Sequence, residues 1–184
     1  MENKMFCYQC QETANCSGCT VSGVCGKKPE VAAMQDLLVY ATKGLSAVAE
    51  QLRAEGKEVS QELNHRVTMN LFITITNANF DNDAIVENIK ETFAMRDAVR
   101  ATLSDSSKLP KAATVEVAEK DYPVFAQSIG VLATENEDIR SLRELITYGL
   151  KGLAAYSKHA NALLKDDANV DAFIQKALAA TLDD

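Results

Sequence analysis

Hydrophobic residues recur at helical spacing from residue 31 onward. Between residues 37 and 52 they follow one another at intervals of three or four, which is typical of a helix that buries one face. Pro29 suits the first turn of this helix and Gly56 its end, because proline is tolerated in a first turn and glycine readily forms a helix C-cap. The apolar positions are Leu37, Ala41, Gly44, Leu45, Val48 and Leu52.

Two further helices are predicted before residue 104. One begins near Ser60 and carries apolar residues as far as Ile75. The other follows a turn-forming segment at 77–81 and is capped by Asn82 or Asp83. Three antiparallel helices joined by short loops favour a bundle over residues 31–103.

The second half of the chain is predicted to be helical as well. Residues 104–134 are expected to form a linker with short elements. A long helix is predicted from about Glu135 to Leu164 and a shorter one over about 169–181. We therefore expect an all-α fold in which residues 135–184 form a second, incomplete helical bundle. The apolar face of the long helix would comprise Leu142, Leu145, Ile146, Gly149, Leu150, Leu153 and Tyr156.

A short internal repeat relates the two long helices. Residues 36–47 resemble residues 144–155, and four aligned pairs are identical. One of these pairs is glycine, which costs roughly 1 kcal/mol relative to alanine inside a helix, so we expect another backbone to approach each glycine closely. A genuine repeat would leave the second bundle one helix short, its apolar face being covered by residues 115–132 or by another chain. The identical pairs are Tyr40/Tyr148, Lys43/Lys151, Gly44/Gly152 and Leu45/Leu153.

Length and composition narrow the class of protein. The chain has 184 residues, of which 47% are hydrophobic and 24% charged, as in soluble globular proteins. A net charge of −7 argues against nucleic-acid binding, which requires a basic surface. No apolar run approaches the roughly 18 residues of a membrane span, and no apolar signal core precedes the first cysteine. We therefore expect a cytoplasmic protein without membrane partners.

All five cysteines lie within the first 25 residues, in a segment (6–28) too polar to fold without a bound group. Such density in a reducing compartment favours metal binding over disulfides. The spacing leaves two ligand sets open. Cys7, Cys10, Cys16 and Cys19 would suit a zinc knuckle and leave Cys25 unused, whereas Cys7, Cys10, Cys19 and Cys25 leave Cys16 unused.

The same segment resembles the N-terminus of a known family. Residues 6–14 (Phe-Cys-Tyr-Gln-Cys-Gln-Glu-Thr-Ala), 18–27 (Gly-Cys-Thr-Val-Ser-Gly-Val-Cys-Gly-Lys) and 35–38 (Gln-Asp-Leu-Leu) are similar to the hybrid cluster proteins, also called prismane proteins or hydroxylamine reductases. The similarity continues through residues 76–81 and 148–152. This resemblance implies that Cys7, Cys10, Cys19 and Cys25 bind a [4Fe–4S] cluster, and that Cys16 is a spare thiol.

The resemblance also implies a role. In that family two helical bundles precede two α/β domains, which hold the hybrid cluster and reduce hydroxylamine. We expect residues 1–30 to be an electron-relay loop of an oxidoreductase family, in a chain that contains no catalytic residue of its own. The expected partners are an electron donor protein and the missing catalytic domains or another chain, including a second copy. The alternative is a standalone cysteine-rich module that binds zinc or a redox-sensing cluster.

Few other residues suggest chemistry. Lys27 and Lys28 are expected in a solvated turn, with stabilisation of a reduced cluster as the functional alternative. Tyr8 would shield the cluster from water. The two histidines, His65 and His159, are expected to be structural or solvated.

Overall fold

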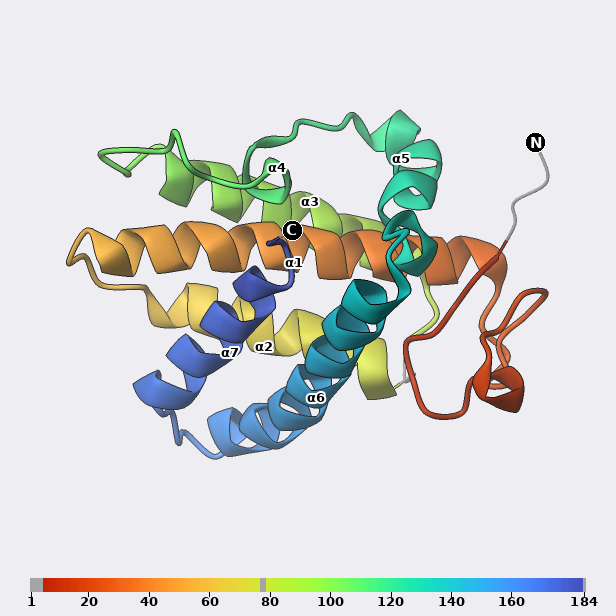
Figure 1. The fold of residues 1–184 in the computed structure, drawn as a ribbon. Coiled ribbons are helices and arrows are strands. Elements are labelled where there is room, and N and C mark those ends of the chain that lie inside the picture. Colours follow the sequence, from red (N-terminus) through yellow and green to blue (C-terminus); the bar gives the residue numbers. More distant parts are fainter. Residues whose placement is uncertain (1–4, 77–78, 184) are drawn as a thin grey trace.

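One long helix organises the fold. The computed structural model describes residues 5–76 and 79–183, and these form an all-α structure. Helix α1 (Pro29–Ala54) runs through the middle of the molecule, with α2 (Gln61–Thr76) and α3 (Asn82–Arg100) on either side of it (Figure 1). Residues 6–28, which carry all five cysteines and are called the cysteine loop below, lie at the N-terminal end of α1 (Figure 1).

Helix α1 is central because more than half of its 26 residues are buried. Leu37, Leu38, Leu45 and Val48 are completely buried. The helix begins at Pro29, as expected from the sequence, and ends at Ala54, with Glu55 as its C-cap and Gly56 directly after it. Gly56 adopts a left-handed conformation (φ 72°), and the N–H groups of Gly56 and Lys57 donate to the carbonyls of Arg53 and Leu52, which is the Schellman arrangement.

The other helices follow the predicted order with small shifts. Helix α3 is capped by Asp81 rather than by Asn82 or Asp83, and the Asp81 carboxylate accepts hydrogen bonds from the N–H groups of Asp83 and Ala84. The turn predicted at 77–81 lies partly outside the described residues. The C-terminal helices are α6 (Glu137–Ala162) and α7 (Ala168–Ala180), close to their predicted bounds. Helices α1 and α6, which carry the internal repeat, both contain 26 residues.

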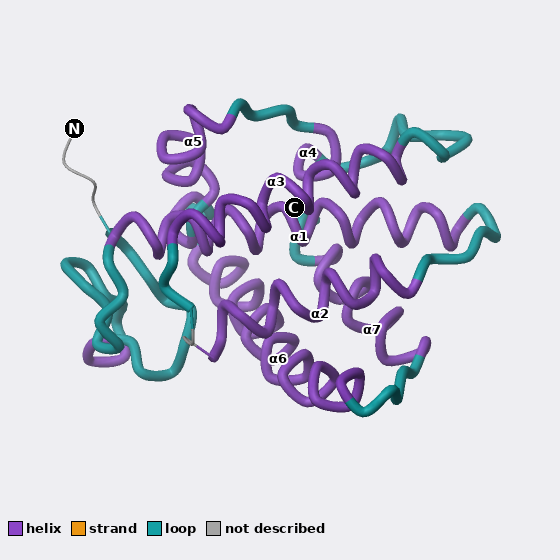
Figure 2. Tube along the Cα trace, turned by 180° about the vertical axis from the view of Figure 1, so that it is seen from behind, coloured by secondary structure: helices purple, strands orange, loops and turns teal. Residues whose placement is uncertain are grey.

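The segment between α3 and α6 is fixed to the bundle. It contains the short helices α4 (Lys111–Thr114) and α5 (Tyr122–Ile129) and a 3-10 turn at Val131–Ala133, and Figure 2 shows it crossing one edge of the molecule. Arg96 of α3 is almost completely buried and donates to the carbonyls of Ala112 and Val115 at 2.9 and 2.8 Å. Helix α5 adds Tyr122 and Ala126 to the core around α1. Helix α5 therefore does not cover the apolar face of α6, although covering by residues 115–132 was one of the two possibilities that the sequence left open.

Helices α6 and α7 share a core with α1 and α2. Leu150 and Ala154 of α6 pack with Leu45 and Leu71 and with Ile174 of α7. The division at residue 135 into two bundles stays a prediction. No helix in the described part of the chain is both long and apolar enough to cross a bilayer.

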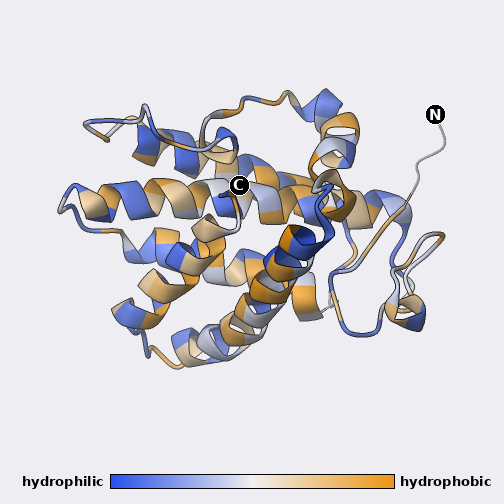
Figure 3. Ribbon diagram, viewed as in Figure 1, coloured by the Kyte–Doolittle hydropathy of each residue, from blue (hydrophilic) through white to orange (hydrophobic). Residues whose placement is uncertain are grey.

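The apolar face predicted for α6 is wrong in its orientation. Leu150 is buried, but Leu142, Leu145 and Tyr156 are 59, 68 and 82% exposed. The side of α6 that faces the core instead carries Thr147, Leu150, Lys151 and Ala154. Apolar positions therefore recur on the open side of α6, which crosses the front of the molecule in Figure 3.

The two repeat glycines have different surroundings. A Cβ on Gly44 would lie 2.1 Å from the carbonyl oxygen of Ala112, so the predicted close approach of another backbone is confirmed there, and α4 provides it. At Gly152 the described chain provides no such approach, because nothing outside the adjoining part of α6 lies within 4 Å of such a Cβ. The repeat thus relates two helices of equal length that have unequal surroundings.

Candidate metal centre

Two of the predicted ligands form the fixed part of the cysteine loop. Cys7 and Cys19 lie opposite one another in an isolated antiparallel bridge and exchange two backbone hydrogen bonds of 3.0 Å. Both side chains are buried, and they pack with Met5 and with Ala32 of α1. Gly18 permits this pairing, because it has φ 120° and its missing Cβ would overlap the Phe6 ring.

The sulfur of Cys19 sits in a polar environment. The N–H of Ala14 donates to Cys19 Sγ at 3.4 Å, and the Thr13 hydroxyl lies 3.7 Å from the same sulfur. Burial raises the pKa of the Cys19 thiol, but these hydrogen bonds, together with one from the N–H of Val24, outweigh it and lower that pKa. Cys19 is therefore inclined toward the thiolate, which is the form that binds metals.

The pKa of the Cys7 thiol is shifted in the opposite direction, upward. Burial raises this pKa, and the positive charge of Lys27 only partly offsets this effect. A thiolate at Cys7 therefore needs a positive partner, such as a metal ion or a nearby lysine.

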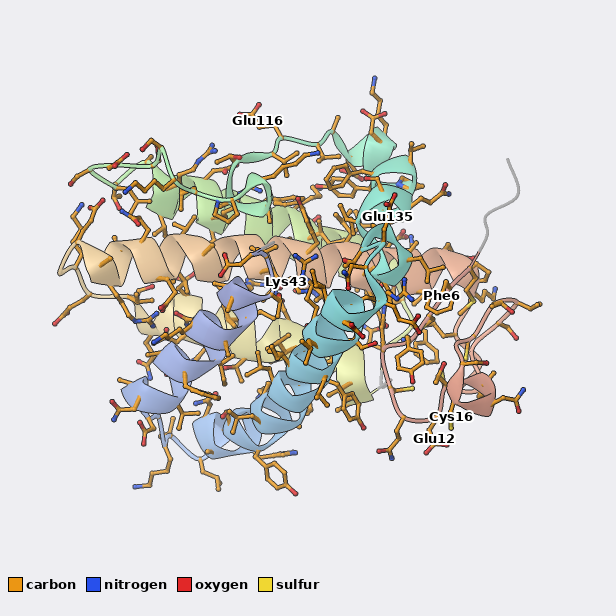
Figure 4. The ribbon with its side chains drawn as sticks, in the orientation of Figure 1. Phe6, Glu12, Cys16, Lys43, Glu116 and Glu135 are labelled. Atoms are coloured by element: carbon orange, nitrogen blue, oxygen red, sulfur yellow. The ribbon has the colours of Figure 1, made fainter. Side chains whose placement is uncertain are left out.

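The remaining cysteines lie nearer to solvent. Cys10 is partly buried, whereas Cys16 and Cys25 are exposed. Gly23 lies directly beside Cys25, since a Cβ on that glycine would be 2.9 Å from Cys25 Sγ. Figure 4 shows Cys16 at the lower edge of the loop, away from α1. Among the residues that the structure describes, no three or more Cys, His, Asp or Glu side chains form a group able to hold a metal ion.

The donor set nevertheless suits an iron–sulfur cluster. Four thiols on one loop are the ligands that such clusters require, and hydrogen bonds to the cysteine sulfurs are a recognised feature of these sites. The paired Cys7 and Cys19 would supply two ligands in place. Cys10 and Cys25 would complete the set by a movement of exposed loop, which is the usual coupling between metal binding and local folding.

Helix α1 holds the loop through Gln9, a residue that the sequence did not single out. Gln9 is almost completely buried, and its amide N–H groups donate to the carbonyl of Ala32 at 3.2 Å and to Asp36 Oδ1 at 2.5 Å. Its carbonyl accepts from Lys27 Nζ at 3.0 Å. The segment between Cys7 and Cys10 is thereby fixed to the core.

The expectation that Lys27 lies in a solvated turn is wrong. Lys28 is exposed, as a solvated turn requires, but Lys27 is only 1% exposed. Its amine is held by Gln9 and lies 5.9 Å from the centre of the Phe80 ring, within range of a cation–π interaction. The sequence gives no local signal for this burial, since both partners are distant along the chain.

Helix α6 contacts the loop from the other side. The Tyr148 hydroxyl donates to Gln11 Oε1 at 2.8 Å. A groove of about 650 Å³ lies between the loop and the first half of α6, and both Cys10 and Cys16 line it. Tyr8 is also on this groove, where it stacks on Phe6, so its predicted shielding role remains a prediction.

The two histidines take no part in this region. His65 Nε2 lies 2.7 Å from Asp166 Oδ1 at the surface, and the ring of His159 packs edge-on against Phe72.

Comparison with known proteins places the chain in a family. The sequence model of the Prismane/CO dehydrogenase family matches residues 5–184. The chain is 56% identical to hydroxylamine reductase of Desulfovibrio desulfuricans over 185 aligned positions, which cover all of this chain and 34% of that protein. It is 49% identical to hydroxylamine reductase 2 of Clostridium acetobutylicum, covering 98% of this chain and 36% of the relative.

The chain belongs to the Prismane/CO dehydrogenase family. It corresponds to the N-terminal part of hydroxylamine reductases and spans about a third of the length of the relatives that it matches.

Proposed function

We propose that this chain is the electron-relay region of a hydroxylamine reductase-type protein, and that its N-terminal loop binds a [4Fe–4S] cluster through Cys7, Cys10, Cys19 and Cys25. The observation that supports this most is the environment of Cys19, whose sulfur accepts hydrogen bonds while its backbone is paired with that of Cys7. When bound, the cluster would supply one-electron transfer.

The chain's own residues would position and tune that cluster. Gln9 and Thr13 hold the loop, and Lys27 adds a buried positive charge beside it. A positive charge in a region of low dielectric favours the more negative, reduced state of a neighbouring centre. Cytoplasmic conditions, in which thiols stay reduced, are consistent with this role.

We further propose that hydroxylamine reduction, the activity in the relatives' names, takes place in the portion of those proteins that this chain does not match. The exposed apolar side of α6 and the groove beside the loop are the surfaces offered for that portion, an electron donor or another chain. This chain would then bind a cluster without turning over hydroxylamine.

The test is anaerobic reconstitution with iron and sulfide, followed by metal analysis and EPR of the reduced protein. About four irons and four sulfides per chain, with a brown colour and an EPR signal on reduction, are expected. A colourless protein that binds one zinc ion would instead support the standalone zinc module. Turnover of hydroxylamine by the reconstituted 184-residue chain would contradict the relay assignment.

A further inference from the structure

A partly open cavity lined by charged side chains lies behind the cysteine loop. It has a volume of about 50 Å³ and lies between α1, α6 and the segment 129–131. Each long helix contributes one carboxylate and one lysine two helical turns apart. These are Asp36 and Lys43 on α1, and Glu144 and Lys151 on α6.

The internal repeat explains this composition. Asp36 aligns with Glu144 and Lys43 with Lys151, so the same pair of charges occurs twice in the sequence. The fold brings both copies to one cavity. Lys151 is only 2% exposed, although isolated lysines are almost never fully buried. Helix packing alone does not require the same pair of charges on both helices at one cavity, so these residues suggest a further role.

The cavity is connected to the loop and to solvent. Gln9, between two of the predicted cluster ligands, donates to Asp36 and lines the cavity. On the other side Lys43 and Glu144 also line a surface hollow of about 440 Å³. The buried Thr147 hydroxyl has no hydrogen-bond partner among the described residues. A cavity of this size with several polar groups suits a bound water, which needs about 10–15 Å³ and two to four partners.

We propose that this cavity is a charge-compensation site, in which Asp36 binds one proton when the loop's cluster takes up one electron. This inference rests on the proposed function. An external one-electron donor supplies the electron, and water at the surface hollow supplies the proton. The only bond formed is O–H on the Asp36 carboxyl group, and the added negative charge of the cluster is balanced by the proton.

The groups around Asp36 support this choice. Burial raises the pKa of Asp36 to about 6, opposed by the hydrogen bond from Gln9 and by the charges of Lys151 and Lys27, while Glu144 adds to the rise. Burial likewise lowers the pKa of Lys151 to about 8. From α1 itself Lys43 and Tyr40 line the same cavity, and residues 129–131 contribute no ionisable side chain. With a pKa raised to about 6, the Asp36 carboxyl group can change its protonation state close to neutral pH.

The test is the cluster's midpoint potential, measured by EPR-monitored redox titration of the reconstituted chain between pH 5 and 9. Reduction makes the surroundings more negative and raises the proton affinity of Asp36, so the potential should fall as pH rises above about 6. A tenfold difference in proton affinity between the two redox states gives a total fall of about 59 mV.

Three variants make the test specific. Asp36→Asn should keep the potential constant over this range, near the low-pH value of the wild type. Lys151→Met removes a charge that lowers the pKa of Asp36, so the pH-dependent range should persist and move to higher pH. Glu116→Gln removes an exposed charge elsewhere and should leave the wild-type profile unchanged.

A second measurement uses only the wild type and Asp36→Asn. Redox-difference infrared spectra should show a protonated carboxyl band on reduction of the wild type, and none in Asp36→Asn. A pH-independent potential in the wild type, or unchanged pH dependence in Asp36→Asn, would overturn the inference and leave the cluster assignment intact. Failure to assemble any cluster would overturn both.

Discussion

Cys7 and Cys19 are held side by side by two reciprocal backbone hydrogen bonds of 3.0 Å, and both thiols are buried against α1. This pair joins the start of the loop to its middle. Cys10 and Cys25 flank it nearer to solvent, and Cys16 lies on an exposed turn. The candidate site thus has a buried half whose backbone is hydrogen-bonded, and a more exposed half.

The choice between ligand sets can be tested by single substitutions. Cys19→Ser should abolish the EPR signal of the reduced, reconstituted chain and lower its iron content, because serine replaces a thiolate ligand with a hydroxyl group. Cys16→Ser should leave both unchanged. Loss of the signal in Cys16→Ser together with its retention in Cys25→Ser would instead favour the ligand set Cys7, Cys10, Cys16 and Cys19.

Thr13 should tune the cluster as well as hold the loop. Its hydroxyl oxygen lies 3.0 Å from the carbonyl oxygen of Cys7 and 3.7 Å from Cys19 Sγ, so its one proton is shared between these two acceptors. Thr13→Val removes both contacts, so the midpoint potential should fall, since fewer hydrogen bonds to sulfur favour the oxidised state. A stability loss of about 1 kcal/mol should accompany it.

The matched control is Thr13→Ser, which retains the hydroxyl group. Redox titration should give it a potential close to that of the wild type. Equal shifts in the serine and valine variants would mean that the methyl group, and not the hydrogen bond, determines the effect.

Lys27 and its neighbour Lys28 offer a comparison of buried and exposed charge. Lys27 is buried and acts electrostatically on both Cys7 and Cys19. Lys27→Met should lower the midpoint potential, because a buried positive charge stabilises the reduced cluster. Lys28→Met should cause a much smaller change, because water and salt screen an exposed lysine. Similar shifts in both variants would show that burial of Lys27 does not strengthen its effect.

The order of the helices could be predicted because their signals are local. Pro29 and Gly56 bound α1 as expected, and the apolar spacing along α1 coincides with its buried face. The orientation of α6 could not be predicted in the same way. Its most apolar side is the exposed one, since the neighbours that determine burial are α1, α2 and α7 and not the helix's own pattern.

The candidate cysteine ligands could be picked out from the sequence, but the residues that contact them could not. The burial of Lys27 depends on Gln9 and Phe80, which lie 18 and 53 positions away. The charged residues of the cavity are visible in the sequence, because the repeat has an acidic residue and a lysine at aligned positions of both helices. A charge repeated where packing requires none is therefore informative.

The repeat glycines give a final prediction about stability. Gly44→Ala should destabilise the fold by at least ~2 kcal/mol, because its Cβ would lie 2.1 Å from the backbone oxygen of Ala112 and would force α4 away from α1. Gly152→Ala should stabilise it by up to ~1 kcal/mol, because alanine is the better helix former and nothing in the described chain outside the adjoining part of α6 lies within 4 Å of the new methyl group.

Urea unfolding followed by circular dichroism measures both effects, provided that the slope of the transition stays unchanged. The two substitutions are chemically identical and occupy aligned positions on helices of equal length, so intrinsic helix propensity cancels between them. Their difference therefore reports the close contact between α1 and α4. Destabilisation of similar size at both positions would mean that a second backbone also lies against Gly152 in solution, as expected if another chain covered the open side of α6.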